Sequence, residues 1–353
     1  MPGSGTMKAM QPEHETLQSS KWRARNPPLG ANLPRLSPKS SRPIRIPIQQ
    51  NKPPKLLTKP SPPFAILPRA ATRPLHFCSQ PERPCPTMRF ITANLNGIRS
   101  AATKGFFDWL PAQNADALGV QEVKAQDEHV AGVFCSSAEL KGHFHYAEKK
   151  GYSGVGLYTR EEPSEVLIGF GIPEFDAEGR YIEKRFDKPG RKLSLISCYF
   201  PSGSSGPERQ EAKYRFLDAM RPHLAALKAE REFILVADVN IAHKEADLKN
   251  WKGNLKNSGF LPEERAWLDQ LFGSGKGQGG LVDVYRQLHP DTTDECYTWW
   301  SNRGQAYAKN VGWRLDYHFA TPKLAALAKR ASIYKDQKFS DHAPLTIDYD
   351  FAL

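Results

Sequence analysis

The sequence has few of the features that mark several common classes of protein. It contains no run of 18 apolar residues, and its mean hydropathy is −0.57, so a membrane-spanning helix is not expected. Its five cysteines form no C-x-x-C pair and are odd in number, which argues against a zinc site and against a disulfide framework. We find no internal repeat. These absences predict a soluble protein of a reducing compartment such as the cytoplasm.

Proline and positive charge are concentrated at the start of the chain. Residues 1–87 hold 18 of the 29 prolines, 14 basic residues and only three acidic ones, which accounts for the whole net charge of +11. The other 266 residues hold 35 basic and 35 acidic residues and are net-neutral. Net charge therefore gives no argument that this larger part binds a polyanion, although a local basic face still could.

The composition predicts two parts, a Pro-rich, basic, disordered extension at 1–87 and a folded domain at 88–353. Three interpretations of the extension stay open: a basic tether for nucleic acid, an organelle-targeting peptide, and an artefact of an upstream start codon. We favour the third, with Met88 as the working start or the extension dispensable. The expected location is then the cytoplasm.

From Met88 onward, short apolar or β-branched runs alternate with helical patterns. Each run has the length of a strand and is bounded by turn-forming residues. The predicted strands lie at 88–95, 115–123, 153–160, 192–200, 231–239, 314–321 and 344–351. The spacing of apolar residues predicts helices over 207–230 and 261–272. This mixture predicts an α/β fold in which two sheets are covered by helices.

Polar side chains stand at or near the ends of these predicted strands. They are Asn94, Asn96, Glu122, Tyr199, Asp238, Asn240, Asp316, Asp341 and His342. Any one of them taken alone is more often a turn former or a cap than a functional group. As a set they favour function, because the strand ends of a sandwich cluster and would bring carboxylates together without compensation. A bound cation would resolve that repulsion.

The residue types at these strand ends suit a hard cation. Glu122 and Asp341, with Asn96 as a neutral oxygen donor, are ligands of the kind that Mg²⁺ or Mn²⁺ prefers, and no cysteine is placed to suit zinc. Such an ion usually keeps waters and meets substrate phosphate. The residues themselves therefore indicate metal-assisted phosphodiester hydrolysis.

Several longer motifs carry a resemblance to a known family. They are ANLNGIR, VQEVK, CYFPSGSSGPERQEAKYRFLDAM, ADVNIAHKEADLKNWKGNLKNSGFLPEER, YTWWSNRGQAYAKNVGWRLDYHFA and SDHAPL. In this order, from about Met88 to Leu353, they resemble the exonuclease III family of abasic-site endonucleases, within the endonuclease/exonuclease/phosphatase superfamily. The PSGSSG stretch is most similar to the bacterial branch. The resemblance therefore implies a catalytic domain at 88–353 that acts in the bacterial cytoplasm, in association with the nucleoid. The resemblance implies a DNase I-like, four-layer α/β sandwich that hydrolyses DNA 5′ to an abasic site and leaves a 3′-hydroxyl.

The resemblance also implies a role for each matching residue. Asp238 would orient or deprotonate the attacking water, and Asn240 would hold that water or the scissile phosphate. His342 would bind a nonbridging phosphate oxygen while Asp316 orients its ring. Tyr199 would donate to the phosphate or stabilise the leaving 3′ oxygen. The metal, Mg²⁺ with Mn²⁺ as the alternative, is assigned to Glu122, Asp341, Asn96 and Asn94.

Five further residues match family positions that select the substrate. Asn254 and Asn257 match contacts with the phosphate and flanking backbone of an extrahelical abasic sugar. Trp299, Trp313 and Leu315 match the walls of the small apolar pocket that receives this sugar. A site that lacks its base has already lost most stacking and pairing, so flipping is cheap there. A pocket too small for a base then rejects intact nucleotides.

Three alternatives stay open. A phosphodiesterase acting on lipid or inositol phosphates would share the metal, Asp238 and His342, but would not need the GNLKN loop or the NVGWRLDY wall. A catalytically silent nucleic-acid-binding module is disfavoured by the intact polar set. The third alternative keeps the family but changes the main activity to 3′-to-5′ exonuclease or 3′-phosphatase trimming of DNA ends. The expected partner is duplex DNA with abasic sites or blocked 3′ ends, with no membrane, and the expected state is a monomer.

Overall fold

The computed structural model describes residues 44–46, 87–273 and 279–353. The chain divides into two units, Met1–Lys39 and Ser40–Leu353, and the described residues all belong to the second. The predicted extension at 1–87 therefore lies outside the described residues, except for Thr87 and residues 44–46. Residues 44–46 form strand β1 (Ile44–Ile46), which the sequence patterns did not predict and which pairs with β7 (Glu165–Ile168).

The first sheet has the strand order β1-β7-β8-β9-β10-β14-β11. Its other strands are β8 (Tyr181–Arg185), β9 (Leu193–Tyr199), β10 (Glu232–Asp238), β11 (Val282–Asp283) and β14 (Asp316–Ala320). Strands β9 and β10 run parallel, whereas β10 and β14 run antiparallel. This register places Asp238 opposite both Tyr199 and Asp316, so three polar side chains meet at one end of the sheet.

The second sheet has the strand order β15-β16-β2-β3-β6-β5-β4. Its strands are β2 (Met88–Asn94), β3 (Ala117–Gln121), β4 (Ser136–Ser137), β5 (Leu140–His145), β6 (Val155–Thr159), β15 (Ala328–Ile333) and β16 (Leu345–Tyr349). Strands β2 and β3 are parallel, so Asn94 and Glu122 leave the sheet at the same end. Strand β16 is antiparallel to β2, so His342, which precedes β16, lies at that end too.

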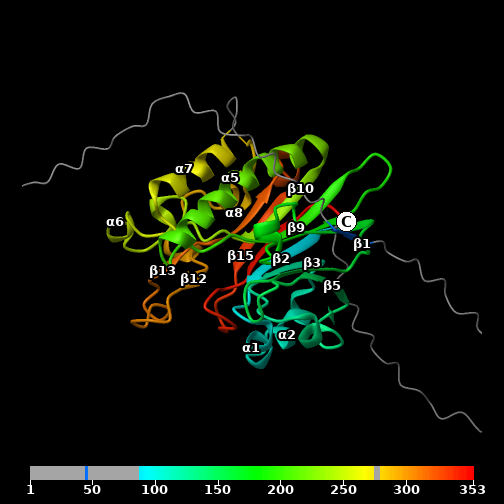
Figure 1. Ribbon diagram of the computed structural model, residues 1–353, viewed down its shortest axis with the longest axis horizontal. Helices are drawn as coiled ribbons and strands as arrows, with labels where there is room; N and C mark the ends of the chain where they lie inside the picture. The colour runs from blue at the N-terminus through cyan, green and yellow to red at the C-terminus, as the bar shows by residue number, and fades with distance from the viewer. Residues whose placement is uncertain (1–43, 47–86, 274–278) are drawn as a thin grey trace, which may run out of the picture. The chain divides into compact units, whose positions relative to one another are not determined.

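Helices cover the outer faces of both sheets and give four layers (Figure 1). Helices α5 (Pro207–Glu230) and α7 (Pro262–Phe272) pack on the first sheet through side chains such as Phe216 and Trp267. Helices α1 (Ile98–Thr103) and α2 (Phe106–Trp109) pack on the second sheet. A third apolar cluster, with Phe90, Leu195 and Ile234 among its members, fills the space between the sheets. The predicted four-layer α/β sandwich is confirmed.

The remaining elements are short. They are the helices α3 (Asp127–Val130), α4 (Pro173–Asp176), α6 (Trp251–Asn254), α8 (Val284–Leu288) and α9 (Pro322–Ala325), and the hairpin of β12 (Trp299–Trp300) and β13 (Gly312–Trp313). Three 3₁₀ turns lie at Leu110–Gln113, Glu245–Asp247 and Asp294–Cys296. Among the helices of the described residues, none is long and apolar enough to cross a membrane.

All seven predicted strands and both predicted helices are present. Helix α5 has the predicted bounds, and both α5 and α7 begin with a proline, whose fixed φ suits the first helical position. The strands that were not predicted include β5, β7, β8 and β15. Charged residues interrupt several of these, as Glu183 and Lys184 do in β8, so they lack the clear apolar runs of the central strands.

Candidate active site

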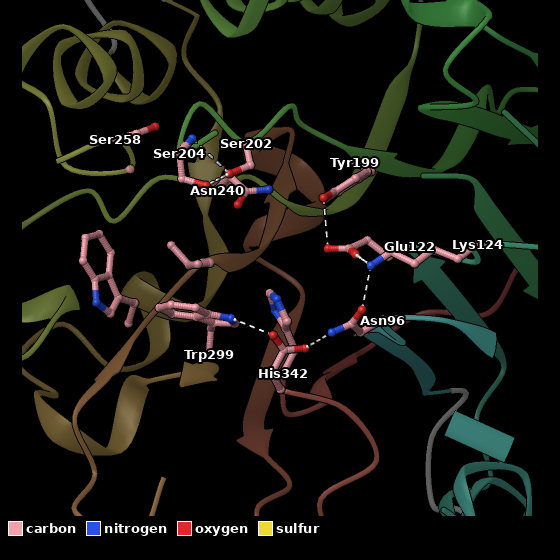
Figure 2. A pocket seen from close by; sticks show the side chains of 14 residues that line it. Asn96, Glu122, Lys124, Tyr199, Ser202, Ser204, Asn240, Ser258, Trp299 and His342 are labelled. Atoms are coloured by element: carbon pink, nitrogen blue, oxygen red, sulfur yellow. Dashed lines mark hydrogen bonds and ion pairs between the residues drawn. The ribbon is translucent and has the colours of Figure 1, made fainter. Parts of the chain in front are cut away.

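The polar strand ends open into a cavity of about 360 Å³ that reaches both sheets (Figure 2). Its lining comprises Asn96, Glu122, Lys124, Tyr199, Ser202, Ser204, Asn240, Ser258, Gly259, Trp299, Trp313, Leu315, Asp341 and His342. Three more predicted residues, Asn94, Asp238 and Asp316, are buried and contact residues of this lining. The structure therefore brings together twelve of the fourteen predicted site residues.

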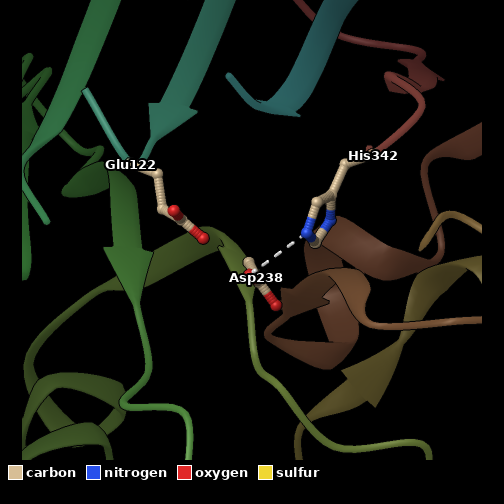
Figure 3. Close-up of side chains that lie close together, drawn as sticks. All are labelled: Glu122, Asp238 and His342. Atoms are coloured by element: carbon tan, nitrogen blue, oxygen red, sulfur yellow. Dashed lines mark ion pairs between the residues drawn. The ribbon is translucent and has the colours of Figure 1, made fainter. Parts of the chain in front are cut away.

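One carboxylate and one imidazole face each other at the centre of this site (Figure 3). The Nε2 atom of His342 lies 3.8 Å from Oδ2 of Asp238, and one ligand atom each of Glu122, Asp238 and His342 lies within 4.8 Å of the others. On its other side, His342 Nδ1 donates to Asp316 Oδ2 at 2.8 Å, since a carboxylate only accepts. This bond fixes the ring so that Nε2 points toward Asp238.

Burial and neighbouring charge shift the protonation of this centre. Burial raises the pKa of Asp238, and the nearby carboxylates of Asp316 and Glu122 raise it further, although His342 opposes them. Burial alone would lower the pKa of His342, but the carboxylates of Asp316 and Asp238 outweigh it and raise that pKa well above its usual range. His342 is therefore a cation at neutral pH, and Asp238 is a carboxylate with an unusually high proton affinity.

Amide side chains orient Asp238. The Nδ2 atom of Asn94 donates both to Asp238 Oδ2 at 2.8 Å and to Glu122 Oε1 at 2.9 Å. The backbone N–H of Asn240 donates to Asp238 Oδ1 at 2.9 Å. The oxygen of Asn94 accepts from the backbone N–H of Asn96 at 2.9 Å. In this orientation the amide nitrogen of Asn94 bridges two carboxylates, and its oxygen accepts a backbone N–H.

A lysine that the sequence interpretation passed over lies among the predicted metal ligands. The Nζ atom of Lys124 is 2.6 Å from Glu122 Oε2 and 2.6 Å from Asn96 Oδ1. The Nδ2 atom of Asn96 in turn donates to Asp341 Oδ1 at 2.7 Å. Burial alone would raise the pKa of Glu122, but Lys124 and Asn94 lower it. An ammonium group thus lies among hard oxygen donors of the type that bind a divalent cation.

The apolar wall of the cavity is formed mainly by the β12–β13 hairpin. Trp299 pairs with Trp313 across the hairpin, and their rings meet edge to face with centroids 6.3 Å apart. The indole N–H of Trp299 donates to Asp341 Oδ2 at 3.1 Å. Leu315 is buried against Leu248 behind these rings. The apolar wall and the charged centre therefore share one cavity and are joined by a hydrogen bond.

Two predicted DNA-binding residues lie outside the cavity lining. Asn254, half-buried, and Asn257, exposed, lie around the end of α6, where Asn257 Nδ2 donates to Asn254 Oδ1 at 2.8 Å. The lining instead includes three serines that were not predicted, Ser202, Ser204 and Ser258. The first two belong to the PSGSSG stretch, whose run of small polar residues after a strand is a signal that could have pointed to them.

Comparisons with known proteins agree with this arrangement. Residues 91–342 match the Endonuclease/Exonuclease/phosphatase family. The chain belongs to this family. It is 34% identical over 261 residues to an exodeoxyribonuclease of Bacillus subtilis (strain 168), covering 74% of this chain and 98% of the relative. It is 35% identical over 263 residues to the DNA repair nuclease APEX1 of Danio rerio, covering 74% and 81%.

The solved structures agree with the fold. The AP endonuclease LMAP of Leishmania major superposes with a TM-score of 0.66 at 26% identity, over 75% of this chain and 88% of that one. The nearly complete coverage of the Bacillus relative agrees with the bacterial branch suggested by the PSGSSG stretch. The family recognised from the motifs and its DNase I-like architecture are thereby confirmed.

Proposed function

We propose that this protein is a DNA-repair endonuclease that hydrolyses the phosphodiester 5′ to an abasic site in duplex DNA and leaves a 3′-hydroxyl. One observation carries the proposal: the Asp238–His342 centre and the Trp299–Trp313 wall share one cavity of about 360 Å³. Such a cavity places an apolar surface for a baseless sugar beside groups that suit phosphate hydrolysis. Relatives named exodeoxyribonuclease, DNA repair nuclease and AP endonuclease support it.

Asp238 is the proposed base. Its Oδ1 is held by the backbone N–H of Asn240, and its buried carboxylate has a raised pKa, so it can accept a proton from a water bound beside it. The Asn240 side chain donates to Phe200 O at 3.0 Å, which keeps its amide at the edge of the cavity, where it would hold the water or the phosphate.

Cationic and phenolic groups face the proposed phosphate position. His342 is an imidazolium held by Asp316, and it would bind a nonbridging oxygen whose charge grows in the transition state. Tyr199 donates to Glu122 Oε1 at 2.9 Å and would turn this proton toward the phosphate or the leaving 3′ oxygen. These groups stabilise developing negative charge without a change of position.

We propose that a divalent ion, Mg²⁺ with Mn²⁺ as the alternative, is held by Glu122, Asp341 and Asn96. When bound, it supplies positive charge to the phosphate and the leaving oxygen. The ammonium of Lys124 contacts Glu122 Oε2 and Asn96 Oδ1, so these two oxygens already face a position that a cation can occupy. Asn94, as it is oriented, would act by holding Glu122 and Asp238 apart at fixed distances rather than as a ligand.

The substrate proposal rests on the shape of the wall. Trp299, Trp313 and Leu315 would enclose the flipped sugar, and the small cavity would exclude a sugar that still carries its base. Asn254 and Asn257 lie around the end of α6, where they would contact the flanking backbone of duplex DNA.

The second candidate is 3′-end processing, as exonuclease or 3′-phosphatase. The Bacillus relative, named an exodeoxyribonuclease, favours it, and the same Asp238–His342 centre would serve it. We further propose that residues 88–353 are the catalytic domain and that it acts in the cytoplasm at the nucleoid, where its DNA would lie.

A cleavage assay separates these candidates. A 5′-labelled duplex with one reduced abasic analogue, which blocks lyase chemistry, is incubated with Mg²⁺, with Mn²⁺ or with EDTA. We expect a single metal-dependent product that ends in a 3′-hydroxyl just 5′ to the lesion, while an undamaged duplex stays intact internally. Trimming from 3′ ends alone would favour the second candidate. No DNA hydrolysis, with turnover of an inositol phosphate, would overturn both.

A further inference from the structure

A buried ion pair lies behind the cavity, between the two helices that cover the first sheet. Lys213 of α5 and Glu264 of α7 have fully buried side chains, and Lys213 Nζ is 2.6 Å from Glu264 Oε1. Removing two charges from water is costly, and two apolar side chains would pack these helices equally well. The position of this pair therefore calls for an explanation beyond helix packing.

The pair is bonded to loops as well as to helices. Glu264 Oε2 accepts from the backbone N–H groups of Gly259 at 2.7 Å and Leu261 at 3.0 Å, and Oε1 also accepts from Gln210 Nε2 at 3.0 Å. Lys213 Nζ donates its second bond to the backbone oxygen of Asn240 at 2.8 Å. Lys213 thus holds the cavity loop at Asn240, and Glu264 holds the cavity loop at Gly259.

Both loops have backbones that need such support. Asn240 has a φ of 55°, in the left-handed region, where its short polar side chain is tolerated. Gly259 has a φ of 93°, and a Cβ at this position would lie 3.1 Å from Asn240 O. The two loops therefore pack backbone to backbone, and both are bonded to the same ion pair.

A third loop of the cavity rests on the same cluster. A Cβ at Gly203 would overlap Gln210 Oε1 and approach Ser258 Oγ to 2.5 Å, so this loop lies directly against the side chain that bonds Glu264. Figure 2 shows Ser202, Ser204, Asn240 and Ser258 on one side of the cavity. The loops that carry them are thus supported by one cluster, formed by Lys213, Glu264 and Gln210.

We propose that Lys213 and Glu264 are positioning residues for the reaction, which set the place of Asn240 and of the serine wall relative to Asp238. This inference rests on the proposed function for its effect on rate, but not for its effect on the loops. An ammonium and a carboxylate are required because they bond backbone groups of both loops, which apolar side chains cannot do. Neither residue lines the cavity, so neither would contact the substrate.

The test uses the full chain with K213M, K213R and the doubly neutral K213M/E264Q, which avoids an unpaired buried charge. R231M is the matched control, because Arg231 is also buried and paired, 2.9 Å from Asp187, but precedes β10 at the end away from Asp238. Two quantities are measured: amide hydrogen exchange of the peptides 239–243 and 257–261, and kcat and KM on the reduced abasic duplex.

We expect faster exchange in both peptides for K213M and K213M/E264Q, and parental exchange there for R231M. On the DNA, kcat should fall about 10–100-fold, as small misplacements of reacting groups do, with KM within about threefold. K213R, which keeps the donors, should retain most of the rate. The proposal would be overturned if amide exchange in the two peptides of K213M/E264Q were as slow as in the parent. It would also be overturned if exchange became faster but kcat stayed equal to that of the parent. If the parent cuts no abasic duplex, the proposed function fails, and exchange alone decides the role of the pair.

Discussion

Two buried clusters of charged side chains lie near the ends of β10 and β14, and they differ in balance. The centre at the cavity gathers Asp238, Asp316 and Glu122 around the imidazolium of His342, and the ammonium of Lys124 contacts Glu122 alone of these carboxylates. The second cluster pairs two guanidinium groups with two carboxylates. Its members are Arg286, Arg314, Asp247 and Asp283.

The balance of charge has opposite consequences in the two clusters. Burial alone would raise the pKa of Asp247, but Arg314 and Arg286 outweigh it and hold that pKa well below its usual range. At the cavity, burial and like charges raise the pKa of Asp238. In a balanced cluster, each charge is neutralised by another member of the cluster. A cluster with more carboxylates than cations can still bind a proton or a cation. The unbalanced cluster is therefore the one suited to chemistry, and the balanced one to holding the β13–β14 segment.

The largest effect is expected from D238N. Removing the proposed base should lower the cleavage rate about 10²–10⁴-fold, while the protein still binds abasic DNA. Cleavage of the reduced abasic duplex and binding in EDTA would be measured side by side. Because Asp238 lies in the unbalanced cluster, its neutralisation should not reduce stability. A variant that cleaves within tenfold of the parent would refute the role of Asp238.

A smaller effect, on stability rather than rate, is expected from R314M. The Arg314 guanidinium is 2.8 Å from both Asp247 and Asp283, so its loss leaves two buried carboxylates without full compensation. We expect a loss of about 3–5 kcal/mol in the free energy of unfolding by urea. R330M is the control, since Arg330 pairs with Asp348 at the surface and should cost about 0–1 kcal/mol. Equal losses in the two variants would show that the balanced cluster stabilises the protein no more than a surface ion pair does.

The smallest effect concerns pH. Because the folded-state pKa of Asp247 is lowered, its ion pairs contribute stability that is fully present above the unfolded value of about 3.9 and is lost as pH falls below it. D247N lacks this contribution at every pH. The difference in unfolding free energy between parent and D247N should therefore be largest above pH ~5 and shrink toward pH ~3. A difference that stays constant would show that Asp247 is not held as a carboxylate by its arginines.

Much of the fold and of the site could be predicted from the sequence, for local reasons. The central strands are buried on both faces and read as apolar runs, and α5 has a proline at its start and a regular apolar stripe. The polar groups at the strand ends break these runs, so they stand out. Edge and amphipathic strands such as β8 carry charges within the strand and give no such contrast.

Other features depended on backbone geometry. Glu122 and Lys124 both have a φ of 49°, which is uncommon outside glycine. No sequence pattern shows that the two side chains meet there, or that Lys124 also bonds Asn96. The sequence likewise did not predict the orientation of the Asn94 amide or the position of Asn254 outside the cavity lining. The pairing of Lys213 with Glu264 joins residues 51 positions apart, within helices whose polar residues were expected to face solvent.

The sequence by itself determined the central strands, the two long helices, the family and the identity of the polar groups, because strand runs, helical spacing and motif order are local properties of the chain. Only the tertiary structure decided which charges are balanced. Whether a buried carboxylate meets an arginine or another carboxylate depends on strand register and on loops that approach from distant positions, as Asp238 opposite Asp316 and Asp247 beside Arg314 show. In a low-dielectric interior, those distances set the pKa of each group and hence its role.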